Sequence, residues 1–150
     1  KKYCTKLAFE KAGKVSKKFK DDLIIGADTI VYFDNTIIGK PKDKKDAFKY
    51  LKKLSNNTHY VYTGVSILNY NLNLNTSLID ETKVTFNKLS DNEINYYIDN
   101  YKPYDKAGAY GIQDWSSIFV KKIDGCFYNV VGFPLSKFYK LFNTLNLNKD

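Results

Sequence analysis

The sequence predicts an α/β fold in which a mixed, twisted sheet is flanked by helices. Three observations predict it: apolar residues recur at helical spacing in several segments, short β-branched and aromatic runs alternate with those segments, and no linker or internal repeat divides the chain. A chain of 150 residues is long enough to bury a core. We therefore expect residues 1–150 to form a single domain.

Apolar spacing and turn residues define the first half of the chain. An apolar stripe with lysines opposite predicts a helix over residues 5–19. The apolar run at 23–27 is typical of a strand buried on both faces, and we expect it to end at Asp28-Thr29. The other elements expected in this half are strands over 30–33 and 36–38, a helix capped by Asp43, and a strand over 58–68.

The second half is organised by an Asn-rich hairpin tip over 69–77 and by Ser90. Ser90 with Glu93 three residues later is a capping-box pattern, which predicts a helix start. The glycine-interrupted stretch 105–113 predicts a loop. The other elements expected here are strands over 78–86, 118–123 and 127–131, and a last helix opened by Pro134 with Leu135, Phe138, Phe142 and Leu145 facing inward.

The net charge of +8 admits a nucleic-acid-binding module as an alternative function. All 24 basic residues are lysines, however, and arginine is the residue that grips phosphates and guanine edges at two points. The lysines also spread over every expected element rather than along one face. We expect no polynucleotide partner, and no apolar run approaches the ~20 residues of a membrane-spanning helix.

Several common catalytic systems are excluded by composition. His59 is the single histidine and falls in a strand pattern, which argues against a Ser-His-Asp triad or a histidine metal site. The sequence contains no P-loop and no dinucleotide-binding glycine motif. Cys4 and Cys126 have no metal or redox spacing. Carboxylate, lysine and polar chemistry at loop positions remains.

Four residues stand out for such chemistry. Asp28 follows a buried apolar run, so its carboxylate could hold Mg²⁺ or accept a proton from water, or could simply cap a turn. Lys40 lies in a constrained Gly-Lys-Pro loop, or is an ordinary solvated lysine. The Gln113 amide could read a base edge, or could lie on the surface. Trp115 follows in a loop, a position that core packing does not readily explain.

Six short segments occur in an order and spacing that cover essentially the whole chain. They are residues 7–12 (LAFEKA), 26–31 (GADTIV), 39–41 (GKP), 62–65 (YTGV), 105–113 (DKAGAYGIQ) and 129–135 (NVVGFPL). Together they resemble the Maf (septum formation inhibitor-like) family, which comprises nucleoside triphosphate pyrophosphatases with an inosine-triphosphatase-like fold.

The resemblance implies hydrolysis of a nucleoside triphosphate to its monophosphate and pyrophosphate, with a divalent metal, Mg²⁺ or Mn²⁺. Asp28 matches the catalytic acidic residue, as base or metal ligand. Lys11 and Lys40 match lysines that hold phosphate charge. The remaining matched substrate-binding positions are Thr29 and Gln113, both linked to base choice, and Asp105 and Lys106.

The Tyr-Gly-Ile-Gln sequence that ends at Gln113 resembles the branch of the family that prefers dTTP and UTP. The resemblance also suggests a cytoplasmic protein and a homodimer, and the family name leaves a division-associated binding role as an alternative.

Two departures from the family pattern bear on the site. The family opens with a Ser-x-Ser-Pro-Arg-Arg loop and a following glutamate, and nothing in this sequence matches them, so we expect an N-terminal strand and phosphate loop before Lys1. Trp115 lies near a usual glycine, where we expect it to narrow the base pocket.

Overall fold

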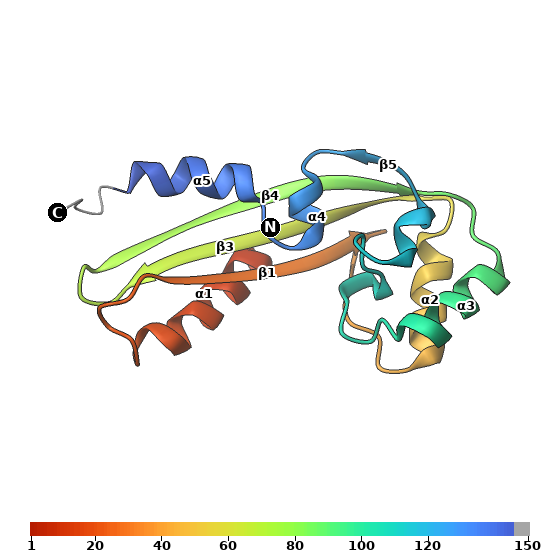
Figure 1. The fold of residues 1–150 in the computed structure, drawn as a ribbon, viewed down its shortest axis with the longest axis horizontal. Helices are drawn as coiled ribbons and strands as arrows, with labels where there is room; N and C mark the ends of the chain where they lie inside the picture. Colours follow the sequence, from red (N-terminus) through yellow and green to blue (C-terminus); the bar gives the residue numbers. More distant parts are fainter. Residues whose placement is uncertain (146–150) are drawn as a thin grey trace.

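The computed structural model describes residues 1–145, so the last five residues of the expected domain lie outside it. The described strands form one five-stranded sheet in the order β2-β1-β3-β4-β5 (Figure 1). The elements are α1 (Lys2–Ser16), β1 (Ile24–Phe33), β2 (Thr36–Ile38), α2 (Lys44–Leu54), β3 (Thr58–Asn69), β4 (Leu74–Phe86), α3 (Asp91–Tyr101), the 3₁₀-helices η1 (Ala107–Ala109) and η2 (Trp115–Phe119), β5 (Val120–Asp124), α4 (Phe127–Val131) and α5 (Leu135–Thr144).

The predicted α/β class, with helices flanking one sheet, is confirmed. The expected mixture of strand directions is not found, because every pairing made by residues 1–145 is antiparallel. Short connections explain part of this: the turn at Asp34 joins β1 to β2, and residues 70–73 join β3 to β4, and such tight turns can only join antiparallel strands. The hairpin tip is therefore shorter than the expected 69–77.

Helix α1 packs directly on the backbone of β1 and β3. A Cβ atom built at Gly26 would lie 2.5 Å from the carbonyl oxygen of Ala8, and one at Gly64 would lie 2.9 Å from the backbone of Thr5. The thiol of Cys4 fills the space beside Gly64: it accepts from the Gly64 N–H at 3.1 Å and donates to the Asp28 carbonyl at 2.9 Å. Glycine at these two positions therefore sets the distance between helix and sheet.

The helix begins and ends three residues earlier than the expected 5–19. The segment that follows it is held by the β3–β4 hairpin, because the Asn69 amide donates to the carbonyls of Asp21 and Asp22 at 2.9 and 3.1 Å. These backbone groups therefore bind the hairpin rather than extending the helix.

Strand β1 runs without a break through Asp28 and Thr29, where we expected it to end. Asp28 is in register with Gly64, and Thr29 with Thr63. Successive side chains of a strand point to opposite faces. Asp28 therefore faces α1, together with Gly26, and Thr29 faces away from it.

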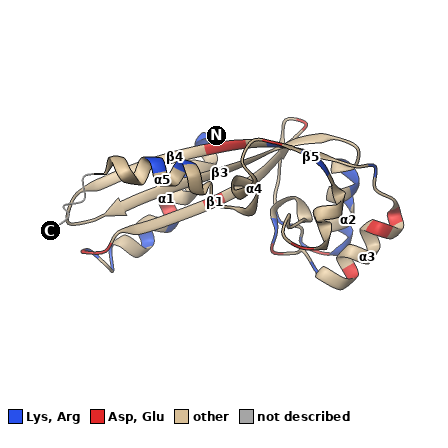
Figure 2. Cartoon of the chain, turned by 45° about the horizontal axis from the view of Figure 1, so that its top comes forward, with Lys and Arg blue, Asp and Glu red and all other residues tan. Residues whose placement is uncertain are grey.

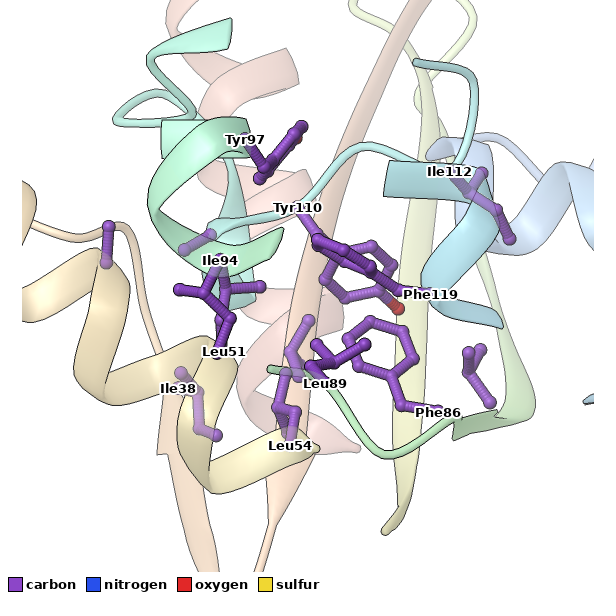
Figure 3. Close-up of a cluster of buried hydrophobic side chains, with 14 of the residues drawn as sticks. Ile38, Leu51, Leu54, Phe86, Leu89, Ile94, Tyr97, Tyr110, Ile112 and Phe119 are labelled. Carbon is purple, nitrogen blue, oxygen red and sulfur yellow. The ribbon is translucent and has the colours of Figure 1, made fainter. Parts of the chain in front are cut away.

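A hydrophobic core lies at the end of the sheet covered by α2 and α3 (Figure 3). Both helices begin at the predicted caps: Asp43 accepts from the Asp46 N–H, and Ser90 and Glu93 form a capping box. Trp115 also packs here, with its ring centroid 4.9 Å from that of Tyr96. The expectation that Trp115 narrows a pocket is wrong, because the aromatic residues of α3 and η2 enclose it.

The strand expected over 127–131 is instead the short helix α4. The buried Asn129 amide donates to the Val61 carbonyl at 3.1 Å and to the Thr82 hydroxyl at 2.9 Å, which ties the helix to β3 and β4. The helix ends at Gly132, which has a φ of 119°. These contacts come from strands distant in sequence, so the local β-branched pattern did not predict them.

The last helix, α5, follows Pro134 as predicted and lies along β4 (Figure 1). The predicted inward face is only partly sequestered. Leu135 is 50% exposed, and Phe138 and Phe142 are half-buried. Within residues 1–145, no helix is both long and apolar enough to cross a membrane.

We expect Gly26→Ala to lower the free energy of unfolding by about 1–3 kcal/mol, because its methyl group would overlap the backbone of α1. Gly13→Ala is the matched control: this helical glycine has nothing within 4 Å of its Cβ position, so alanine should stabilise by up to about 1 kcal/mol. Urea denaturation measures both. A neutral Gly26→Ala would contradict the packing described for α1.

His59 is fully buried, and its Nε2 shares a 2.8 Å hydrogen bond with the Tyr110 hydroxyl. Burial lowers the pKa of His59 to about 4. The unfolded chain therefore binds more protons between about pH 6.5 and pH 4, and stability falls as the pH falls through this window.

Over that window we expect His59 to account for a loss of roughly 2–3 kcal/mol of stability. Equilibrium unfolding at several pH values would measure it against His59→Phe, which cannot take up a proton. Parallel losses in the two proteins below pH 6.5 would exclude this contribution.

Candidate active site

One edge of β1 has no strand partner over Ile24–Ile30 within residues 1–145. A cavity of about 530 Å³ lies at this edge. Its lining comes from both faces of β1, so the cavity wraps around this edge. The predicted site residues all line it: Lys11, Asp28, Thr29, Lys40, Asp105, Lys106 and Gln113. These residues are far apart in the sequence, from α1 to the segment after α3, and the fold brings them together around one cavity.

On the α1 side of the sheet the cavity is charged. Lys11, on α1, forms an ion pair with Asp28 through Oδ1. The Asp28 side chain is 15% exposed and that of Lys11 is 59% exposed, so the carboxylate is the recessed partner. The contact between α1 and Gly26 places this pair, because Gly26 and Asp28 share one face of β1.

Two loops bring further charges to the cavity, and they pack by way of Gly108 against Val31, on the face of β1 away from α1. Lys40 follows β2, and Lys106 precedes η1; the loops are joined by a hydrogen bond from the Gly108 N–H to the Gly39 carbonyl at 3.0 Å. Lys106 donates to Asp105 at 3.0 Å, which with the more distant Lys40 holds the pKa of Asp105 below its usual range. Three lysines and three carboxylates thus line the cavity, with Asp114 as the third carboxylate.

On the opposite face of β1 the lining is mostly apolar. Thr29 lies there, with the side chains Val31, Val61, Tyr110, Ile112, Val130 and Val131 around it. Gln113 stands on an exposed loop at this part of the cavity. An apolar wall with a few polar groups is the usual lining of a small-molecule site.

The loop that carries Gln113 is anchored by residues that the sequence did not single out. The buried Tyr97 donates to Asp114 at 2.9 Å and accepts from the Gly111 N–H at 3.2 Å. Ser116 also bonds Gly111 and Asp114. Tyr97 lies on the buried face of α3, and spacing along a helix gives no sign of a hydroxyl partner in a distant loop.

Asp28 has the chemistry to hold a hard divalent cation. The described residues contain no group of three or more metal-binding side chains. Mg²⁺, however, is commonly bound by one or two protein carboxylates together with substrate phosphates and water. A recessed carboxylate beside lysines fits an ion that arrives with an anionic ligand rather than one held in a protein cage.

A cavity that combines charged side chains with an apolar wall is suited to a ligand with an anionic end and a flat apolar end, as a nucleotide has. The chain belongs to the Maf family: residues 1–145 match the family model described as "Maf-like protein".

Relatives in the genus Clostridium agree with this. A "dTTP/UTP pyrophosphatase" of Clostridium botulinum (strain Kyoto / Type A2) is 48% identical over 97% of this chain and 77% of its own length. A protein of the same name from Clostridium botulinum (strain Alaska E43 / Type E3) is 49% identical over 90% of this chain and 72% of its own length. Another from Clostridium novyi (strain NT) is 46% identical over 97% of this chain and 77% of its own length.

Tyr97→Phe should keep the aromatic packing and remove the hydroxyl that anchors Gly111 and Asp114. We expect about 1–2 kcal/mol less stability and faster amide hydrogen exchange at Gly111. Tyr101→Phe is the control, since Tyr101 stacks on the same rings and is 42% exposed. Equal effects of the two changes on Gly111 exchange would refute the anchoring role.

Proposed function

We propose that this chain hydrolyses dTTP or UTP to the monophosphate and pyrophosphate, as the names of its relatives indicate for those proteins. The observation that carries the proposal is one cavity that wraps the β1 edge and combines the Lys11–Asp28 pair, the lysines of two neighbouring loops and an apolar wall. We assign the triphosphate to the charged side and the pyrimidine to the apolar side. Because the lining draws on residues from α1 to α4, we also propose that residues 1–150 belong to one domain.

Asp28 is the residue we assign to the attacking water. In this role its carboxylate accepts a proton as the water oxygen bonds to the α-phosphorus, and the bond from that phosphorus to the bridging oxygen breaks to release pyrophosphate. Lys11 holds the carboxylate in place before substrate binds. Lys11 and Lys40 then offset charge on the phosphates, with Lys106 and Asp105 at the same rim.

A divalent ion, Mg²⁺ or Mn²⁺, fits this scheme, with Asp28 as its protein ligand. When bound, such an ion would neutralise phosphate charge and polarise the scissile bond. Thr29 and Gln113 would contact the base. We further propose that the protein is cytoplasmic and that it acts as a homodimer. Analytical ultracentrifugation would test the oligomeric state.

The distribution of charge does not favour the nucleic-acid alternative. Figure 2 shows lysines scattered over several helices and strands, with acidic residues among them on α3 and β4. A duplex-binding surface gathers its basic residues on one face. Several of these lysines are also paired, as Lys44 is with Asp99 and Lys52 with Asp91. A division-associated role has no structural observation in its favour.

Asp28→Asn should lower kcat for pyrophosphate release from dTTP by about 100-fold or more, because the amide cannot take up the proton. Asp80→Asn is the matched control: Asp80 is similarly recessed, at 17% exposure, and pairs with Lys137 at 3.0 Å, but it does not line the cavity. The assay follows pyrophosphate with Mg²⁺, with Mn²⁺ and with EDTA.

Full activity in Asp28→Asn would remove Asp28 from the reaction. No release from dTTP or UTP by the unmodified protein, with either metal, would overturn the proposed function itself.

A further inference from the structure

Thr63 lies beneath Thr29 on β3 and touches no part of the cavity, yet it controls what Thr29 can offer a ligand. The two hydroxyl oxygens lie 2.8 Å apart, and by geometry alone either could donate. Thr63 is fully buried, and its hydroxyl also lies 2.8 Å from the backbone carbonyl oxygen of Asn129.

A hydroxyl carries one hydrogen, and a carbonyl oxygen can only accept. The Thr63 hydrogen must therefore point to the Asn129 carbonyl. The Thr63 oxygen is then left to accept, so the Thr29 hydroxyl donates its hydrogen to Thr63. Thr29 consequently presents only lone pairs to the cavity.

The Asn129 carbonyl, which accepts the hydrogen bond from Thr63, is held in a fixed position. The Asn129 side chain binds Val61 and Thr82, and the Asn129 carbonyl also accepts from the Gly132 N–H at 3.1 Å. With two donors on this oxygen, its hydrogen-bonding capacity is filled. The orientation of the Thr63 hydroxyl is thus set by α4 and two strands, not by the ligand.

We propose that Thr63 is a positioning residue that makes Thr29 an obligate hydrogen-bond acceptor, so that the site selects a pyrimidine whose N3 carries a hydrogen. This rests on the proposed function and deepens it. Thymine and uracil carry N3–H, whereas N3 of cytosine is itself an acceptor and would face the Thr29 lone pairs.

The surroundings of Thr29 favour a base over a phosphate as the group it meets. An acceptor-only oxygen repels phosphate oxygens, and strand alternation places Thr29 on the apolar side, away from Lys11 and Asp28. A sugar hydroxyl could also donate to Thr29, but dTMP and dCMP carry the same sugar. A comparison of these two ligands therefore isolates the contribution of the base.

Calorimetric titration of dTMP and dCMP without metal tests the proposal independently of turnover. The unmodified chain should bind dTMP about tenfold or more tightly than dCMP, because two acceptors brought together where the ligand excludes water are costly. In Thr63→Val the Thr29 hydrogen loses its acceptor and can turn toward the ligand. Binding of dCMP should then tighten, and the preference should fall about fivefold or more.

Three variants separate this from a general structural effect. Thr63→Ser keeps the hydroxyl and should retain the preference. Thr29→Val should weaken dTMP binding without improving dCMP binding, and it keeps the test open if Thr63→Val does not fold. Thr85→Val removes a similar cross-strand contact, 2.8 Å from Thr58 and outside the cavity, and should change neither affinity.

An unchanged preference in folded Thr63→Val, or an equal loss of affinity for both ligands, would overturn the role of Thr63. So would failure of the unmodified chain to distinguish or bind the two nucleotides. Pyrophosphate release from dTTP by the unmodified chain, measured in parallel, reports separately on the proposed function. If the unmodified chain releases pyrophosphate but Thr63→Val keeps the base preference, the proposed function stands and only the role of Thr63 is overturned.

Discussion

The close approach of helix α1 to the strand pair β1–β3 is the constraint on which the site depends. Side chains at positions 26 and 64 would hold the helix away from the sheet, and with glycine there the helix rests on backbone. Lys11 then reaches Asp28, and the Cys4 thiol bonds both strands beneath them. The ion pair is thus a consequence of the missing side chains as much as of the charges.

The other side of the sheet is organised by hydrogen bonds rather than by close packing. Asn129 and Thr82 fasten α4 to β3 and β4, and this brings the backbone after Asn129 next to Thr29. Hydrogen bonds inside a protein are strengthened by the low local dielectric, so these contacts fix the position of α4 even though the Asn129 Oδ1 has no partner among the described residues. Helix α1 therefore positions one lining of the cavity, and the hydrogen bonds of Asn129 and Thr82 position the other. Strand β1 lies between the two linings and fixes their relative position.

The sequence predicted correctly the features that depend on residues close together in the chain, such as the starts of α2 and α3. Asp43 and Ser90 cap their helices because a cap is satisfied within four residues. The resemblance to the Maf family also predicted the residues that gather at the cavity, although spacing alone could not have joined α1 to the loop at 105–113.

The errors arise where distant contacts decide the outcome. Residues 127–131 have a β-branched and aromatic pattern, but the partners of Asn129 lie on β3 and β4 and favour a helix. Asp28 reads as the end of a strand because it is charged, and Lys11 supplies the compensation that lets the strand continue. Trp115 looked unplaced because its aromatic neighbours on α3 are not adjacent in sequence.

The placement of Asp28 and Thr29 as neighbours on one strand limits how such a site can diverge. Sliding β1 by one residue against β3 would turn each side chain to the other face, so the carboxylate would enter the apolar lining and the threonine would meet Lys11. Insertions in this strand would therefore abolish the site rather than alter it. New base preferences would have to arise from substitutions in the loop around Gln113 or in the wall formed by α4, while the catalytic half stays unchanged.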